Sequence, residues 1–239
     1  MDLQQEEHKE GGGKVRSFIL GFNDGLISVF TLLVGVAAAQ LNKPNFFYVV
    51  ILTGAAAMVS GAVSMGLGEY ISSKSEYKFQ ENEIRRERAE IKLFPEEEKK
   101  EVKQFFKEWG FKGEQLDNAV ETITSDQDNW IDFLTKSELG LEEPESPVIG
   151  GIITFFAFII GSLTTLFPYF FNAGLMSLVS SSIISFVMLF IIGSLKTKIT
   201  GEKYWKSGLE MVIVGIIAFI VSYGVGTWVE LIVPQAPNV

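Results

Sequence analysis

The sequence lacks cysteine altogether and has a single histidine, and both absences exclude whole kinds of site. Without cysteine the chain forms no disulfide and holds no thiolate-bound metal. The histidine, His8, lies in a polar opening segment, where a solvated side chain is expected rather than a ligand. A di-iron carboxylate enzyme needs paired Glu-x-x-His motifs, which one histidine does not supply. We therefore expect no enzymatic activity and no permanently bound cofactor.

Charged residues are missing from long stretches of the chain. No Asp, Glu, Lys, Arg or His occurs from Val148 to Leu195, a run of 48 residues. As one helix this run would be about 72 Å long, more than twice the roughly 30 Å hydrocarbon core of a bilayer. It is therefore expected to cross a membrane twice and to turn at PYFFNAG, Pro168 to Gly174. Two further runs, Met211 to Val229 and Asn45 to Gly68, each fit one crossing.

The first apolar segment contains a carboxylate. Gly25 to Ala39 spans 15 residues, or roughly 22 Å of helix, which is too short to cross. Extension back to Ser17 gives a full span and brings Asp24 into the membrane. Such a residue normally faces a protein interior or a watery path, so we expect Asp24 to bind a cation or to carry a proton. The alternative is that Asn-Asp-Gly only breaks or caps the helix at the membrane surface.

These runs predict an all-α membrane protein with five transmembrane helices and a small acidic helical cytoplasmic domain inserted between spans two and three. Nineteen of the twenty lysines and arginines fall on one side of this topology and Lys43 on the other, which places the N-terminus in the cytoplasm. The expected divisions are a flexible cytoplasmic tail (1–16), spans one and two (17–71), the inserted domain (72–147), spans three to five (148–233) and a tail (234–239).

The expected insertion carries 20 acidic and 12 basic residues. Its apolar residues recur at helical spacing, which predicts a folded helical domain rather than a loose loop. Tyr77, Ile84 and Ile91 stand seven apart, which predicts that the second span continues as one long helix. Three shorter helices are expected to follow: one from Pro95 to a stop at Gly110, one around residues 116–123, and one capped by Ser125 or Asp126 that runs to Gly140.

Glutamates repeat at helical spacing in this insertion. Glu83, Glu87 and Glu90 are at i, i+4 and i+7, so they share one face, and Glu98 and Glu101 repeat the spacing on the next helix. Like charges stacked in this way repel one another. A bound cation would convert the repulsion into attraction.

A simpler interpretation of the same helix is also open. Glu81 with Arg85, and Arg86 with Glu90, have the spacing of ordinary ion pairs on a solvated face. If the acids do bind a metal, oxygen ligands favour Mg²⁺, Ca²⁺, Mn²⁺ or Fe²⁺.

The second span carries a methionine and two rows of small residues. Met65 lies near its cytoplasmic end, and a thioether ligand would favour Fe²⁺ or Mn²⁺ over Mg²⁺. The alternative is that Met65 only packs between helices. The rows Ala57–Gly61 and Ser60–Ser64–Gly68 are small residues four apart, which allow helices to approach closely.

Several motifs occur in a fixed order. They are FNDGLISVFTLLVGVAA in the first span, SGAVSMGLGEYISSKSE at the exit of the second, then ERAE, KSELGLEEPE and PYFF. Together they resemble the vacuolar iron transporter family, from about Val15 to Val229. The resemblance implies dimeric five-span carriers that move Fe²⁺, and often Mn²⁺, out of the cytosol in exchange for protons. It also implies a glutamate-rich helical metal-binding domain between spans two and three.

By this resemblance, Asp24 and Met65 match the acid and the methionine of the membrane pathway. The acids of the metal-binding domain are matched by Glu87, Glu90, Glu98, Glu101 and Glu138.

The chain departs from the family pattern at two places. Ala57 stands where some members have a glutamate, and Leu134 and Thr135 stand where they have a methionine pair. These departures leave the preference between Fe²⁺ and Mn²⁺, and the proton coupling, open.

The function expected from these features is export of Fe²⁺, Mn²⁺ or both from the cytosol, with the metal as substrate and protons as counter-ions. The alternative is a membrane-anchored iron-binding or sensing protein that does not transport. The expected partners are divalent metal ions, protons, the lipid bilayer and a second copy in a homodimer, with no nucleic acid. The expected location is a multi-pass position in the cell membrane or in an internal, vacuole-type membrane.

Overall fold

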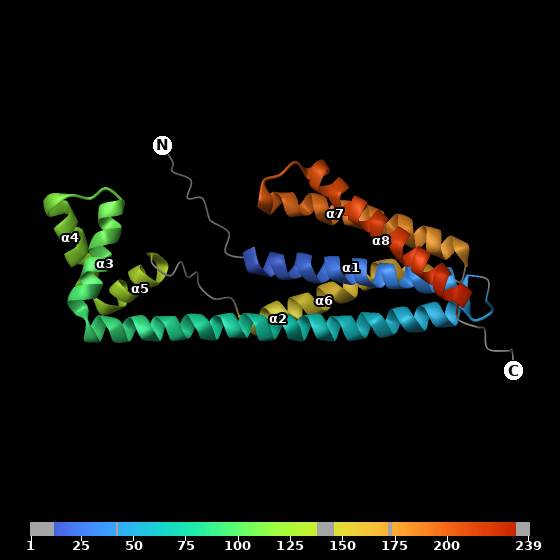
Figure 1. Cartoon of the computed structure of the whole chain (residues 1–239), viewed down its shortest axis with the longest axis horizontal. Coiled ribbons are helices and arrows are strands. Elements are labelled where there is room, and N and C mark those ends of the chain that lie inside the picture. Colours follow the sequence, from blue (N-terminus) through green and yellow to red (C-terminus); the bar gives the residue numbers. More distant parts are fainter. Residues whose placement is uncertain (1–11, 42, 138–145, 172–173, 233–239) are drawn as a thin grey trace. The chain divides into compact units, whose positions relative to one another are not determined.

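The computed structural model describes residues 12–41, 43–137, 146–171 and 174–232, and within these ranges every regular element is helical. The chain divides into two compact units. Residues 1–70 with 148–239 form the bundle unit, and residues 71–147 form the insertion unit. Helix α2 is continuous and contributes to both (Figure 1). The predicted all-α class is confirmed.

Five helices of the described chain are long and apolar enough to cross a membrane, as predicted. One of them, α6, is followed by the short 3-10 helix η1, where the sequence predicts the turn of the 48-residue apolar run. The helices are α1 (Gly12–Gln40), α2 (Phe46–Leu93), α6 (Pro147–Leu166) with η1 (Phe167–Phe171), α7 (Leu175–Thr200) and α8 (Tyr204–Ile232).

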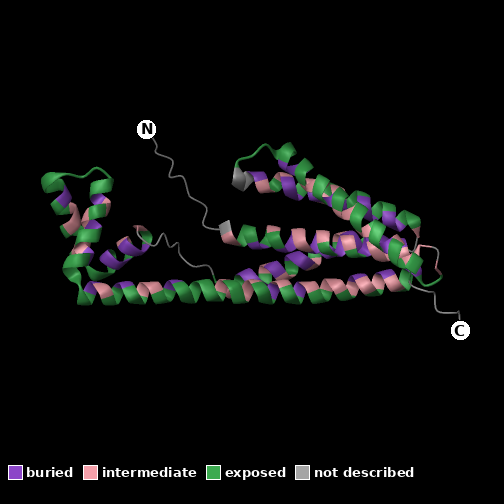
Figure 2. Cartoon of the chain, in the orientation of Figure 1, coloured by how far each residue is buried: buried purple, intermediate pink, exposed green. Residues whose placement is uncertain are grey.

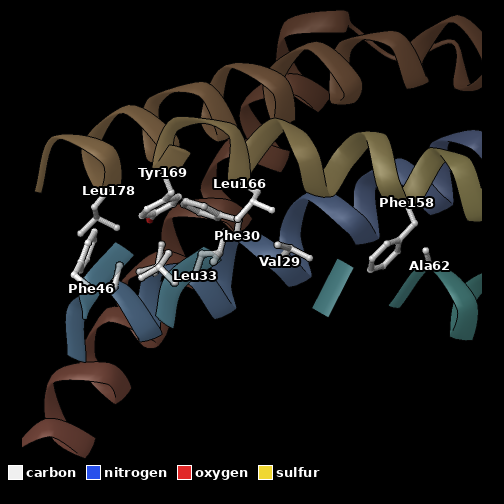
Figure 3. Close-up of a cluster of buried hydrophobic side chains, with 12 residues drawn as sticks. Val29, Phe30, Leu33, Phe46, Ala62, Phe158, Leu166, Tyr169 and Leu178 are labelled. Carbon is white, nitrogen blue, oxygen red and sulfur yellow. The ribbon is translucent and has the colours of Figure 1, made fainter. Parts of the chain in front are cut away.

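The core of the bundle unit gathers side chains from α1, α2, α6, η1 and α7. Figure 3 shows Phe30 and Leu33 of α1 near Leu166 of α6, and Phe158 of α6 beside Ala62 of α2. The outer faces are also apolar, because large hydrophobic side chains are exposed on all five of the long apolar helices. Only 11% of the most apolar stretch of α8 is buried, and much of α8 is coloured as exposed in Figure 2. An apolar surface of this extent suits lipid rather than water.

Helix α6 contacts both α1 and α2 through glycines. A Cβ on Gly25 would collide with the backbone of Phe158, and one on Gly61 would collide with the Phe158 ring. Of the two predicted rows of small residues, the one with Gly61 therefore packs against a helix. The other does not, because Ser60, Ser64 and Gly68 are exposed and a Cβ on Gly68 would meet nothing within 4 Å.

The insertion unit is built on the last part of α2. It adds α3 (Pro95–Glu108), α4 (Gly113–Thr124) and α5 (Gln127–Ser137). The predicted ends of α3 and the predicted start of α5 are confirmed, whereas the predicted stop of the last helix at Gly140 lies outside the described residues. Pro95 begins α3 and Gly110 follows it with φ 95°, a conformation that favours glycine. Asp126 Oδ1 accepts hydrogen bonds from the backbone N–H groups of Asp128 and Asn129 and so caps α5.

Aromatic rings fill much of the small core of the insertion unit. Phe106 stacks on Phe133 with a centroid distance of 5.1 Å, and the edges of Trp109 and Phe111 meet the Phe106 ring. The predicted continuation of the second span as one long helix is confirmed, because α2 runs unbroken to Leu93. Of the residues that predicted it, Ile91 is buried and Tyr77 is exposed. The remaining buried members of this core are Val102, Leu116, Trp130, Ile131 and Leu134.

Candidate metal-binding sites

Asp24 lies inside a continuous helix. Its carboxylate is half-buried, and Ser28 Oγ donates a hydrogen bond to Asp24 Oδ1 at 2.8 Å from the next turn of α1. The alternative that Asn-Asp-Gly breaks the helix is therefore wrong. The preceding residue, Asn23, has a buried side-chain oxygen with no hydrogen-bond partner among the described residues. Sequence reasoning did not single out Asn23, although it belongs to the same motif.

Met65 is half-buried and packs against the core of the bundle unit. Contacts of α6 show how the position of Met65 along the bundle compares with that of Asp24. Phe158 lies against Gly25, the neighbour of Asp24, and also against Gly61, four residues before Met65. Four residues of helix rise about 6 Å. Asp24 and Met65 thus lie within about one helical turn of a common level, as a shared pathway requires.

A second acid of the bundle unit was missed by sequence reasoning. Glu69, in the GEY sequence of α2, accepts a hydrogen bond from Ser17 Oγ of α1 at 3.1 Å. It follows the charge-free run directly and lies one turn after Met65. Its position at the end of the charge-free run, one turn from Met65, was the sequence signal that could have identified Glu69.

The predicted glutamates of the insertion unit differ sharply in burial. Glu87 of α2 is 5% exposed and Glu98 of α3 is 7% exposed, whereas Glu90 is half-buried and Glu101 is exposed. Glu138 lies outside the described residues. Ionised carboxylates are almost never buried unless a charge, a hydrogen bond or a metal compensates them. Glu87 and Glu98 are therefore the strongest ligand candidates in this unit.

The simpler interpretation in terms of ion pairs is correct for two other glutamates. Arg85 approaches Glu81 at 3.5 Å, and Arg86 Nε donates to Glu90 Oε1 at 3.0 Å. The hydrogen bond to Glu90 and the charge of Glu90, followed by the charge of Glu83, raise the pKa of Arg86, which lies beyond the apolar part of α2. The acidic face of α2 is thus partly neutralised by its own arginines.

Buried neutral polar groups occur in the same unit. Gln80 Oε1, Thr135 Oγ1 and Trp130 Nε1 are buried with no hydrogen-bond partner among the described residues. Gln80 precedes Glu87 by two helical turns on the same face of α2. Amide and hydroxyl oxygens with carboxylates are donors of the kind that hard divalent cations take.

In the described part of the chain, no three carboxylate or histidine side chains are close enough together to hold a metal ion. The ligand set Glu87, Glu90, Glu98, Glu101 and Glu138 therefore stays a prediction.

Comparison with known proteins gives a consistent result. The sequence model of the VIT family matches residues 15–227. A vacuolar iron transporter of Centaurea cyanus is 32% identical over 94% of this chain and 91% of its own length. Vacuolar iron transporter 1 of Arabidopsis thaliana is 32% identical over 93% of this chain and 89% of its own. The vacuolar iron transporter of Plasmodium falciparum is 29% identical, with 95% and 86% covered.

Proposed function

The chain belongs to the VIT family, and from that membership we propose that it exports a divalent metal ion, Fe²⁺ or Mn²⁺, from the cytosol in exchange for protons. The relatives named as vacuolar iron transporters support iron as the metal. The direction, the Mn²⁺ and the exchange with protons are what the family resemblance implies. The names of these relatives also support a vacuole-type membrane as the location. The excess of lysine and arginine on one side of the topology supports a cytoplasmic N-terminus and insertion unit. As the family resemblance implies, the working form is a homodimer.

The insertion unit collects the cation. Its excess of 20 acidic over 12 basic residues raises the local concentration of divalent ions. Glu87 and Glu98, whose side chains the fold has already removed from water, then bind the ion through their carboxylate oxygens. Glu90, Glu101 and Glu138 complete the acidic set.

Asp24 and Met65 take the ion within the bundle. Inside an apolar span, a carboxylate is stable only when a proton, a cation or polar groups compensate its charge. Release of the metal on the far side therefore favours uptake of a proton by Asp24, and arrival of the next metal displaces that proton. Because the metal ion and the proton occupy Asp24 in turn, metal transport is coupled to proton transport in the opposite direction.

The ligand atoms of the proposed sites determine the expected selectivity between Fe²⁺ and Mn²⁺. Met65 supplies the only sulfur in the proposed sites, since Leu134 and Thr135 occupy the positions of the methionine pair. Oxygen donors separate Fe²⁺ from Mn²⁺ weakly. We therefore propose that the chain carries both ions, and that the lack of an acid at Ala57 reduces the number of protons exchanged.

The observation that carries the proposal is Asp24, a half-buried carboxylate inside a continuous membrane-spanning helix. The test is metal flux into liposomes that contain a metal-quenched dye, under an imposed pH gradient. Asp24→Asn keeps the size of the side chain and removes its charge, so metal transport and proton counter-flow should both fall to background. Glu210→Gln, an exposed acid of α8, is the matched control and should transport normally. Normal flux in Asp24→Asn would show that Asp24 has no part in transport.

A second candidate function is metal binding or sensing without transport, which the buried Glu87 and Glu98 also favour. The purified full chain would then bind Mn²⁺ in a calorimetric titration and show no flux in the liposomes. Binding together with flux would exclude this candidate.

A further inference from the structure

We propose that Glu69 is a third ion-handling residue of the bundle unit, at the end of the pathway that adjoins the insertion unit in sequence. The inference rests on the proposed transport function. It assigns to Glu69 a transient contact with the divalent cation before the ion reaches Met65 and Asp24.

Glu69 lies where three helices meet. Its Oε1 accepts the hydrogen bond from Ser17 Oγ of α1, at 3.1 Å. A Cβ on Gly150, in the first turn of α6, would lie 3.5 Å from the same oxygen and 3.7 Å from Ser17 Oγ. The first turn of α6 thus lies beside the carboxylate, and even a Cβ at Gly150 would be in ordinary van der Waals contact with it.

The helices around this junction are closely packed. A Cβ on Gly151 would lie 2.8 Å from the carbonyl oxygen of Gly66 and 3.1 Å from Tyr70 Cβ. Thr154 Oγ1 donates to the carbonyl oxygen of Ser17 at 3.3 Å. Ser17 itself is 4% exposed. The carboxylate of Glu69 is therefore held by a buried hydroxyl between rigid neighbours, and does not extend freely into solvent.

The order along the helices matches a path. Glu69 follows Met65 by four residues, so both lie on one face of α2 about 6 Å apart along its axis. Ser17 precedes Asp24 by seven residues, two turns along one face of α1. Because Ser17 and Glu69 are in contact, the same two helix faces carry Ser17 and Glu69 at one level, and Asp24 and Met65 deeper in the bundle.

The neutral hydroxyl is a partner that a cation displaces readily. A hydrogen bond from a neutral hydroxyl to a carboxylate is weaker than a direct contact between that carboxylate and a divalent ion in a poorly solvated place. An arriving cation would take Glu69 Oε1 from Ser17, and Ser17 would regain the carboxylate when the ion moves on to Met65.

Two substitutions distinguish this role from a structural one. Glu69→Gln keeps an oxygen that accepts the Ser17 hydroxyl but removes the charge. In the liposome assay with Mn²⁺ we expect the apparent KM to rise about ten-fold or more, the loss of one charge-assisted contact, with a smaller change in maximal rate. Ser17→Ala removes the hydroxyl and leaves the charge, so its KM should stay at or below that of the parent chain.

The opposite pattern would overturn the proposal. If Glu69 only joins α1 to α2, Glu69→Gln transports like the parent and Ser17→Ala loses flux. Glu69→Asp retains the charge, so its apparent KM for Mn²⁺ gives a second test if Glu69→Gln folds poorly. It should recover part of the affinity, and equal impairment of both variants would contradict the role of the charge. Glu76→Gln, an exposed acid seven residues further along α2, is the control for general effects of charge.

Failure of the inference and failure of the proposed function have different signatures. Absence of flux in the parent chain would overturn both. Flux in the parent with an unchanged KM in Glu69→Gln would overturn only the role of Glu69.

Discussion

The two units of this chain use acidic residues in opposite ways. In the bundle unit, Asp24 and Glu69 each accept a hydrogen bond from a serine, on helices that pack closely through glycine. The insertion unit has 20 acids in a short segment, and of those in its described part Glu87 and Glu98 are buried. In the bundle unit, Asp24 and Glu69 stand out in the sequence because few acids lie in or beside its apolar helices. In the insertion unit, only the packing of the helices shows which of the many acids are removed from water.

The two units also differ in how their cores are packed. Helices of the bundle unit approach closely at glycines, since Gly25 lies against the backbone of Phe158 and Gly61 against its ring. They also bury hydroxyls such as those of Thr165 and Ser181, which lie 3.0 Å apart. The insertion unit lacks such contacts in its described core and relies on stacked rings around Phe106. Its stability should therefore depend on a few large side chains, whereas that of the bundle unit depends on the lack of side chains at particular places.

The largest expected effect is on the core of the insertion unit. Phe106→Ala should cost about 3–5 kcal/mol, because a ring that is 8% exposed and stacks on Phe133 leaves a cavity. Hydrogen exchange should then show lost protection in α3, α4 and α5, with α1 and α6 unchanged. Phe79→Ala, at a ring that is 60% exposed, is the control and should have little effect. Loss of protection in both units would show that they do not unfold separately.

A second prediction concerns the buried acids. Mn²⁺ at about a hundred times its Kd should stabilise the insertion unit by about 2.7 kcal/mol, measured as slower hydrogen exchange across residues 71–137 of the full chain. Glu87→Gln should abolish this metal-dependent protection, because it removes the charge of one of the two buried carboxylates. Glu97→Gln, an exposed neighbour of Glu98, should keep the protection. Equal loss in both variants would assign the binding to diffuse charge.

The glycine contacts of the bundle unit give a third prediction. Gly25→Ala should destabilise by about 1–3 kcal/mol, because a Cβ there would lie 2.8 Å from Phe158 Cα. Gly68→Ala, in the same unit with nothing within 4 Å, should be neutral or stabilise by about 0.5–1 kcal/mol. Thermal unfolding in detergent measures both changes. A harmless Gly25→Ala would mean that α1 and α6 are not as close as described.

The smallest effect is expected at an ion pair on the surface of the insertion unit. Lys103 Nζ lies 2.6 Å from Asp117 Oδ1, but both side chains are well exposed. Asp117→Asn should therefore cost about 0.2–1 kcal/mol, and less at high salt. Urea unfolding at low and high ionic strength measures the difference. A cost as large as that of Phe106→Ala would contradict a core held mainly by rings.

Much of this architecture could be predicted because it follows from the lengths of the apolar segments compared with the thickness of a bilayer. A 48-residue run without charge must turn once, and the structure places η1 at that turn. The span that contains Asp24 is too short without it, and α1 is indeed continuous through Asp24. Local chemistry also predicted Pro95 at the start of α3 and Asp126 at the start of α5.

The candidate sites were less predictable, since spacing on one helix does not show what faces it. Sequence spacing placed Glu83, Glu87 and Glu90 together, but Glu90 pairs with Arg86 while Glu87 is buried. Glu69 was missed because its partner, Ser17, lies 52 residues away.

The sequence by itself determined the number of apolar helices and the segment that holds most of the charge, because the bilayer thickness and the helical rise per residue leave little choice. Only the tertiary structure decided which acids leave water and which small residues touch a neighbour. Gly61 and Gly68 both belong to rows of small residues on α2, yet one lies against the Phe158 ring and a Cβ on the other would meet nothing within 4 Å. Burial depends on the face that another helix covers, and that face is set by contacts between residues far apart in the chain.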